Sequence, residues 1–229
     1  MLINKYLQID NSHLKDGYFI VRCTKKTIKK IKIFVQKSGN ILHYNINGTE
    51  TIPCNMGTGK YTVTLYENTK ASRFTAIGQV SFTADFYYWA PFSHPNQYVN
   101  YTEDSPCVRK AAELCKGLEY NFEKYAAICK YIDSHFVFDY IKSATTKGFV
   151  LPDIDACFKK KMGVCQDLAA MAAAMLRSQG VECAFVIGYA NKKYHAWVEP
   201  SVAFELVYDP TNNIQHNKKK ITYVKEREY

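Results

Sequence analysis

Apolar and polar residues alternate through much of the first 86 residues, and this period of two predicts short β-strands. The clearest example is Tyr61-Thr62-Val63-Thr64-Leu65. Turn-forming pairs such as Asp16-Gly17 and Asn47-Gly48 separate these segments at intervals of roughly ten residues. The strands that we expect are Leu2–Ile9, Tyr18–Cys23, Ile31–Gln36, Ile41–Ile46, Lys60–Tyr66 and Phe74–Phe86. Such regular spacing favours an all-β sandwich over residues 1–90.

From Ser105 onward the apolar residues repeat with the period of an α-helix. Ser105-Pro106 supplies an N-cap and a proline at the first helical position, and a second helix begins at Asn121. The residues expected on the buried faces of these two helices are Val108, Ala111, Ala112, Cys115, Tyr125, Ile128, Cys129 and Ile132. A polar, lysine-bearing opposite face completes the amphipathic pattern. Residues 91–229 are therefore expected to form a second, helix-containing domain.

The last third of the chain combines helical and strand patterns. Asp153 can cap a short helix, and the alanine-rich run Leu168–Arg177 is a strong helix former that should end before Gly180. Two strands are expected after it, Tyr194–Glu199 and Phe204–Asp209, the second stopped by a proline. The fold class predicted for the whole chain is α+β.

Composition places the chain among globular proteins. Of its 229 residues 47% are hydrophobic and 22% are charged, which excludes disorder as a description of the whole chain. There is no apolar run of about 18 residues, the length of a membrane span, and no basic segment followed by an apolar core that would indicate a secretory signal. With eight scattered cysteines, we expect a cytoplasmic protein with reduced thiols. A secreted protein already trimmed of its signal peptide is the alternative.

The net charge of +9 comes mainly from the N-terminal part. Residues 1–100 hold 12 basic and 5 acidic residues, whereas residues 101–229 hold 18 and 16. The excess is concentrated at Lys25, Lys26, Lys29, Lys30 and Lys32. A solvated face explains this charge, and an acidic partner of the N-terminal domain is the alternative. No motif for a specific nucleic acid accompanies it.

Cys165 is the first candidate for chemistry. It directly precedes the alanine-rich run, so it should lie at the N-terminus of a helix, where backbone N–H groups and the helix dipole stabilise a thiolate. Gly163 leaves the backbone free to turn sharply there. Cys107, Cys115 and Cys129 have no C-x-x-C spacing and are expected to be small core residues rather than metal ligands.

His195 and Asp209 are the second and third candidates. If the two C-terminal strands are antiparallel with a turn near residue 202, the two side chains are direct cross-strand partners on one face. The same register places Glu199 opposite Glu205. A base that accepts the thiol proton and a carboxylate that orients the imidazole complete the requirements of a nucleophilic cysteine.

These residues resemble the transglutaminase-like superfamily. The matching segments are Gly163-Val164-Cys165-Gln166-Asp167, His195-Ala196-Trp197-Val198-Glu199 and Tyr208-Asp209-Pro210-Thr211, within residues 105–215. The resemblance implies a papain-like core of helices packed on an antiparallel sheet. It implies Cys165 as the nucleophile, His195 as the general base and acid, and Asp209 as the orienting residue. Acyl transfer would proceed from a protein or peptide amide through a thioester.

Other residues enter through the same resemblance. The backbone N–H of Cys165 is a natural oxyanion donor at a helix start. Tyr140 and Gln166 are candidates for oxyanion or substrate contacts, and Trp197 is expected to pack behind His195. No acidic cluster like the calcium sites of the large animal enzymes is present, and no H-x-x-x-H pair, so no metal or cofactor is expected.

The resemblance leaves three functions open. The thioester could be resolved by a lysine amine, as in a transglutaminase, or by water, as in a cysteine peptidase or amidase. A binding protein with an idle triad is the third reading. Ammonia release and amine incorporation distinguish the first two.

Overall fold

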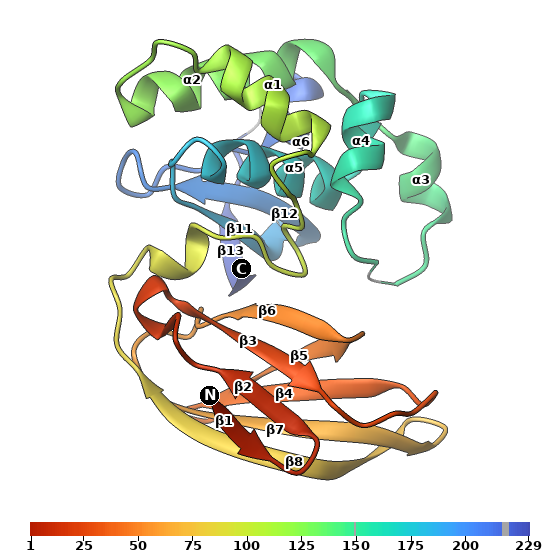
Figure 1. Cartoon of the computed structure of the whole chain (residues 1–229). Coiled ribbons are helices and arrows are strands. Elements are labelled where there is room, and N and C mark those ends of the chain that lie inside the picture. The colour runs from red at the N-terminus through yellow and green to blue at the C-terminus, as the bar shows by residue number, and fades with distance from the viewer. Residues whose placement is uncertain (149, 217–219) are drawn as a thin grey trace. The chain divides into compact units, whose positions relative to one another are not determined.

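A computed structural model describes residues 1–148, 150–216 and 220–229 of the protein. The chain forms two compact units, residues 1–91 and residues 92–229. Figure 1 shows strands alone in the first unit apart from short turns of 3-10 helix, and helices packed on a sheet in the second. The predicted α+β class is confirmed. Within the described residues, no helix has the length and apolar character needed to cross a membrane.

The first unit contains two four-stranded antiparallel sheets. One has the order β1 (Leu2–Asn4), β2 (Leu7–Asp10), β3 (Tyr18–Cys23), β6 (Thr49–Pro53). The other has the order β5 (Asn40–Ile46), β4 (Ile31–Lys37), β7 (Gly59–Lys70), β8 (Arg73–Ala84). Alternate residues point inward, and the Phe19 ring of one sheet packs on Phe82 of the other, with ring centroids 5.1 Å apart. The predicted sandwich is confirmed.

Two details of this unit differ from the sequence prediction. The segment expected to be one strand over Leu2–Ile9 is a hairpin in which Leu2 pairs with Ile9. Its turn contains Lys5 in the left-handed conformation, with φ 49°. Lysine seldom adopts this conformation, so the residue gave no sign of a turn in the sequence. The strand β6 was missed because its residues lack clear alternation.

One buried helix lies at the centre of the second unit. That helix, α5 (Cys165–Arg177), is buried at every residue from Asp167 to its end. It packs against strands β11 (Cys183–Ala190) and β12 (Lys193–Pro200). On its other sides lie α1 (Pro106–Leu114), α2 (Asn121–His135), α4 (Ile154–Lys160) and α6 (Pro210–Ile214). Its alanines allow these neighbours to approach closely, which is why so apolar a segment occupies the centre.

The remaining elements complete the sheet and position the helix start. The antiparallel sheet has the order β12, β11, β13 (Tyr223–Glu228). A short parallel pair, β9 (Val137–Phe138) and β10 (Met162–Gly163), lies just before α3 (Tyr140–Thr145) and α5 respectively. The packing of helices on an antiparallel sheet agrees with the core that the sequence predicts.

The prediction of a strand over Phe204–Asp209 is wrong. Only an isolated bridge between Tyr208 and Val198 forms there, and Asp209 is the N-cap of α6. Glu205 takes a positive φ of 52°, so the segment is a turn and Glu199 does not face it in a ladder. Ala112, expected inside, is exposed, whereas Val108, Ala111 and Cys115 are buried.

The C-terminal end of α5 is fixed by a buried arginine. The Arg177 guanidinium is 4% exposed and donates hydrogen bonds to the main-chain oxygens of His94, Cys183 and Tyr229. One side chain therefore holds the helix end against the strand that follows it and against two segments that are distant in the sequence.

We expect Arg177→Met to lower the free energy of unfolding by about 3 kcal/mol, because the main-chain oxygens of His94, Cys183 and Tyr229 each lose hydrogen bonds from a buried guanidinium. Urea unfolding followed by circular dichroism measures this change. Arg109→Met is the matched control, since the Arg109 side chain is 63% exposed and contacts only an exposed aspartate; its effect should stay within about 0.5 kcal/mol. Equal effects of the two substitutions would contradict the anchoring role.

Candidate active site

Cys165 is the first residue of α5, as the alanine-rich run predicts. Val164 is the N-cap residue in an extended conformation, with φ −87° and ψ 175°. The first N–H groups of a helix have no partner inside the helix, and the dipole is positive at this end. Cys165 is partly exposed and lines a cavity of about 550 Å³.

Gly163 is required here by close packing. A Cβ atom at this position would lie 2.7 Å from Cys157 Sγ and 2.9 Å from Asp167 Cβ, both too close for a real side chain. The sequence analysis explained Gly163 by a sharp turn, whereas the structure explains it by the lack of space for a side chain. The absent side chain lets β10 lie directly against the start of α5.

Asp167 connects the start of α5 to its surroundings. This carboxylate is 1% exposed. Its Oδ2 accepts hydrogen bonds from the Val164 N–H at 3.1 Å and from Lys142 Nζ of α3 at 2.6 Å. Its Oδ1 accepts the N–H of Asp153, the N-cap residue of α4, at 3.3 Å. A buried charge with these partners fixes the turn that carries Cys165.

His195 and Asp209 are in direct contact. His195 Nε2 lies 2.9 Å from Asp209 Oδ2, and the two side chains are 15% and 3% exposed. Asp209 reaches this position as a helix N-cap: its Oδ1 accepts the N–H of Asn212 at 3.0 Å. Pro210 keeps it extended, with φ −111° and ψ 93°. The two residues are thus neighbours without being the cross-strand partners that the sequence predicts.

The imidazole of His195 also neighbours the Cys165 side chain, and both residues line the same cavity. Because Nε2 is engaged by Asp209, the nitrogen available to the sulfur is Nδ1. The structure therefore brings all three predicted residues together, from α5, β12 and the start of α6.

The charge state of His195 depends on these two neighbours. Burial by itself lowers the pKa of an imidazole, but the hydrogen bonds to Asp209 and to Cys165 and their negative charges outweigh it and raise the pKa of His195 to about 10. The imidazolium is therefore favoured at neutral pH.

The other cysteines differ from Cys165. All eight are free thiols, and six of them are buried. Burial raises the pKa of Cys54, Cys107 and Cys183 to about 12. The expectation that Cys107, Cys115 and Cys129 are core residues is confirmed. Only Cys23 shares the partial exposure of Cys165.

Tyr223 is a site residue that sequence reasoning missed. It lies at the start of β13, and its hydroxyl donates a hydrogen bond to Asp209 Oδ2 at 2.9 Å. Burial, followed by the charge of Asp209, raises the pKa of Tyr223, so the phenol stays a donor at neutral pH. Nothing in the local sequence marks this residue, because its partner belongs to another element.

The three secondary candidates lie around the cavity and do not line it. Trp197 is fully buried and packs on the Tyr223 ring, with centroids 5.0 Å apart. Gln166 Nε2 donates to the Val150 carbonyl at 2.5 Å. Tyr140 is 67% exposed, and its hydroxyl accepts a hydrogen bond at 3.4 Å from Gln215, which does line the cavity.

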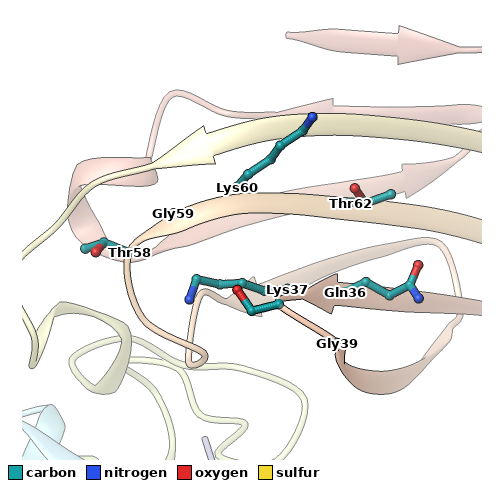
Figure 2. Close-up of a pocket in the computed structure, with 8 residues that line it drawn as sticks. Gln36, Lys37, Gly39, Thr58, Gly59, Lys60 and Thr62 are labelled. Carbon is teal, nitrogen blue, oxygen red and sulfur yellow. The ribbon is translucent and has the colours of Figure 1, made fainter.

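The first unit contains a different kind of cavity. Its volume is about 510 Å³, and its lining, shown in Figure 2, is polar and includes Lys37 and Lys60. It contains no cysteine or histidine. One lysine of the basic segment, Lys25, is paired with Glu67 at 2.6 Å, so the positive charge of this unit is partly compensated.

Comparisons with known proteins agree with the motifs. Residues 109–215 match the model of the transglutaminase-like superfamily. An uncharacterized protein of Mycobacterium leprae is 31% identical over 103 residues, which cover 40% of this chain and 36% of that protein. The chain thus spans about a third of the length of this relative.

Solved structures give distant likenesses. A candidate cysteine protease from Cytophaga hutchinsonii has a TM-score of 0.48 and 17% identity, over 93% of this chain and 83% of that one. The periplasmic domain of TgpA from Pseudomonas aeruginosa has a TM-score of 0.42 and 11% identity, over 95% and 97%. Red sea bream transglutaminase has a TM-score of 0.33 and 12% identity, over 89% and 49%. The family match covers residues 109–215, which lie within the second unit.

We expect Asp209→Asn to lower the pKa of His195 by about 1 to 3 units, the range for losing a nearby opposite charge. Asparagine is itself a good N-cap, so α6 should be retained. NMR titration of the ring nitrogens measures the pKa, with a wild-type midpoint near pH 10. Asp155→Asn, an exposed charge change outside the site, is the control.

The same shift predicts how stability depends on pH. The folded-state pKa of His195 lies above its unfolded value of about 6.5. The pair therefore contributes fully to the free energy of unfolding below about pH 6.5, and this contribution is lost as the pH rises toward about 10.

An unchanged His195 titration in the Asp209 variant would contradict the assignment of Asp209 as the residue that raises this pKa.

Proposed function

We propose that the protein is a cysteine-dependent enzyme that transfers the acyl group of a protein or peptide amide. The observation that carries this proposal is the contact of Cys165, His195 and Asp209 at one cavity. The match of residues 109–215 to the transglutaminase-like superfamily supports the same chemistry. Cys165 is the nucleophile, His195 the general acid and base, and Asp209 the group that orients the imidazole.

The first step forms a thioester. The Cys165 thiolate attacks the amide carbonyl carbon, and an S–C bond forms as the carbonyl electrons move to oxygen. The Cys165 N–H, at the start of α5, is suited to donate to that oxyanion. When the C–N bond breaks, the Nδ1 proton of His195 passes to the departing nitrogen, which leaves as ammonia or an amine.

The second step releases the acyl group. Neutral His195 takes a proton from the incoming amine or water, which attacks the thioester carbonyl. The C–S bond breaks and the thiolate is restored beside the imidazolium. Asp209 keeps its negative charge throughout, held by His195, Tyr223 and the Asn212 N–H. Trp197 and Tyr223 exclude water from the rear of this pair.

Hydrolysis by the same triad is the second candidate function. Cys165 is partly exposed at the cavity, so water can also reach a thioester formed there. A glutamine-containing peptide incubated with a fluorescent amine separates the two outcomes. Amine incorporation supports transfer, whereas ammonia or peptide release without incorporation supports hydrolysis.

We expect Cys165→Ala to abolish both ammonia release and amine incorporation while the far-UV spectrum and unfolding midpoint remain those of the wild type. Alanine starts a helix well and removes only the sulfur. Cys23→Ala, which removes the other partly exposed thiol, is the control and should keep full activity. An active Cys165 variant would refute the nucleophile, and an inactive wild type over a broad peptide library would support the idle binding protein.

A further inference from the structure

The cavity beside Cys165 carries one positive charge that the triad does not use. Among the described residues that line it, Lys193 is the one charged side chain besides the paired His195 and Asp209. The described residues provide no ion-pair partner for Lys193. Asp209 is the one carboxylate of the described lining, and its oxygens are already hydrogen-bonded.

Lys193 stands in a defined relation to the reacting groups. It begins β12, two residues before His195, so both side chains project from the same face of the strand. Two residues of strand span about 7 Å. A group bound by the Lys193 ammonium therefore lies in the cavity that His195 and Cys165 also line.

The hairpin that carries Lys193 is held in place. Ala190 pairs with Lys193 across a two-residue turn of Asn191 and Lys192, whose φ values of 47° and 71° are those of a type I′ turn. Asn191 ties this turn to the segment before β13, through bonds with the main chain of Thr222 at 3.0 and 2.9 Å and of Lys220 at 3.3 Å. Glycine is the usual residue at such angles.

We propose that this cavity selects acyl donors that carry a carboxylate close to the reacting amide, with Lys193 as the residue that binds the carboxylate. The proposal rests on the proposed function and specifies its substrate class: acidic peptides.

Alkylation of Cys165 by two reagents of matched size tests the proposal without a known substrate. Iodoacetate carries a carboxylate next to its reacting carbon, and iodoacetamide is its neutral analogue. In Lys193→Met, at low ionic strength, we expect the ratio of the iodoacetate rate to the iodoacetamide rate to fall by about three- to tenfold. Lys193→Arg should retain the wild-type ratio. Lys130→Met on the exposed face of α2 removes the same charge elsewhere and should also retain it.

Each outcome of this experiment is informative. An unchanged ratio in Lys193→Met overturns the carboxylate subsite, and so does an equal fall of both rates, which would mean that Lys193 acts on the thiolate alone. A wild-type Cys165 that reacts with neither reagent overturns the proposed function itself. With an active preparation, Lys193→Met should raise KM for a glutamine peptide flanked by glutamate. Its KM for the same peptide flanked by glutamine should not change.

Discussion

The hydrogen bond between Asp209 and His195 is the interaction on which the chemistry of this protein depends. An imidazole with its side chain 15% exposed would otherwise be neutral, because burial disfavours its charged form. The carboxylate reverses this preference and raises the pKa of His195 to about 10, together with Cys165. Asp209 can do so because it is itself held by three donors, from β12, β13 and the first turn of α6. A charge that is fixed and surrounded in this way is a strong orienting group.

The rest of the second unit keeps Cys165 in reach of that imidazole. Its helix is fixed at both ends by buried charged side chains, Asp167 at the start and Arg177 at the end. Both satisfy main-chain groups of segments far apart in the sequence. Between them the alanine-rich stretch permits close packing on all sides. The nucleophile thus sits on a rigid element, as precise positioning requires.

Features with a local cause could be predicted from the sequence. The start of α1 follows from its first proline, that of α4 from the Asp153 N-cap, and those of α2 and α5 from helical periodicity and composition. The position of Cys165 follows with them. The same signal was present in Asp209-Pro210 and indicates a helix N-cap, but the apolar residues before it were interpreted as a strand. The predicted contact with His195 was nevertheless correct, because a helix start brings the carboxylate to the same place.

Features with a distant cause could not be predicted. The strand β11 is a continuous apolar run without alternation, and β13 is polar and forms because it pairs with β11. Tyr223 and Lys142 owe their roles to partners in other elements, Asp209 and Asp167. Tyr140 and Gln166 match the family pattern, yet neither side chain lines the cavity. Gln166 hydrogen-bonds a residue outside the lining, and Tyr140 contacts the lining only through its hydrogen bond from Gln215.

The pairing of His195 with both Asp209 and Cys165 is the central claim, and an NMR titration of the His195 ring in wild type and in Cys165→Ala tests it most directly. The hydrogen bond to Cys165 and the charge of Cys165 both raise the pKa of His195. The account therefore predicts a lower titration midpoint of His195 in Cys165→Ala than in the wild type. An unchanged midpoint would contradict it.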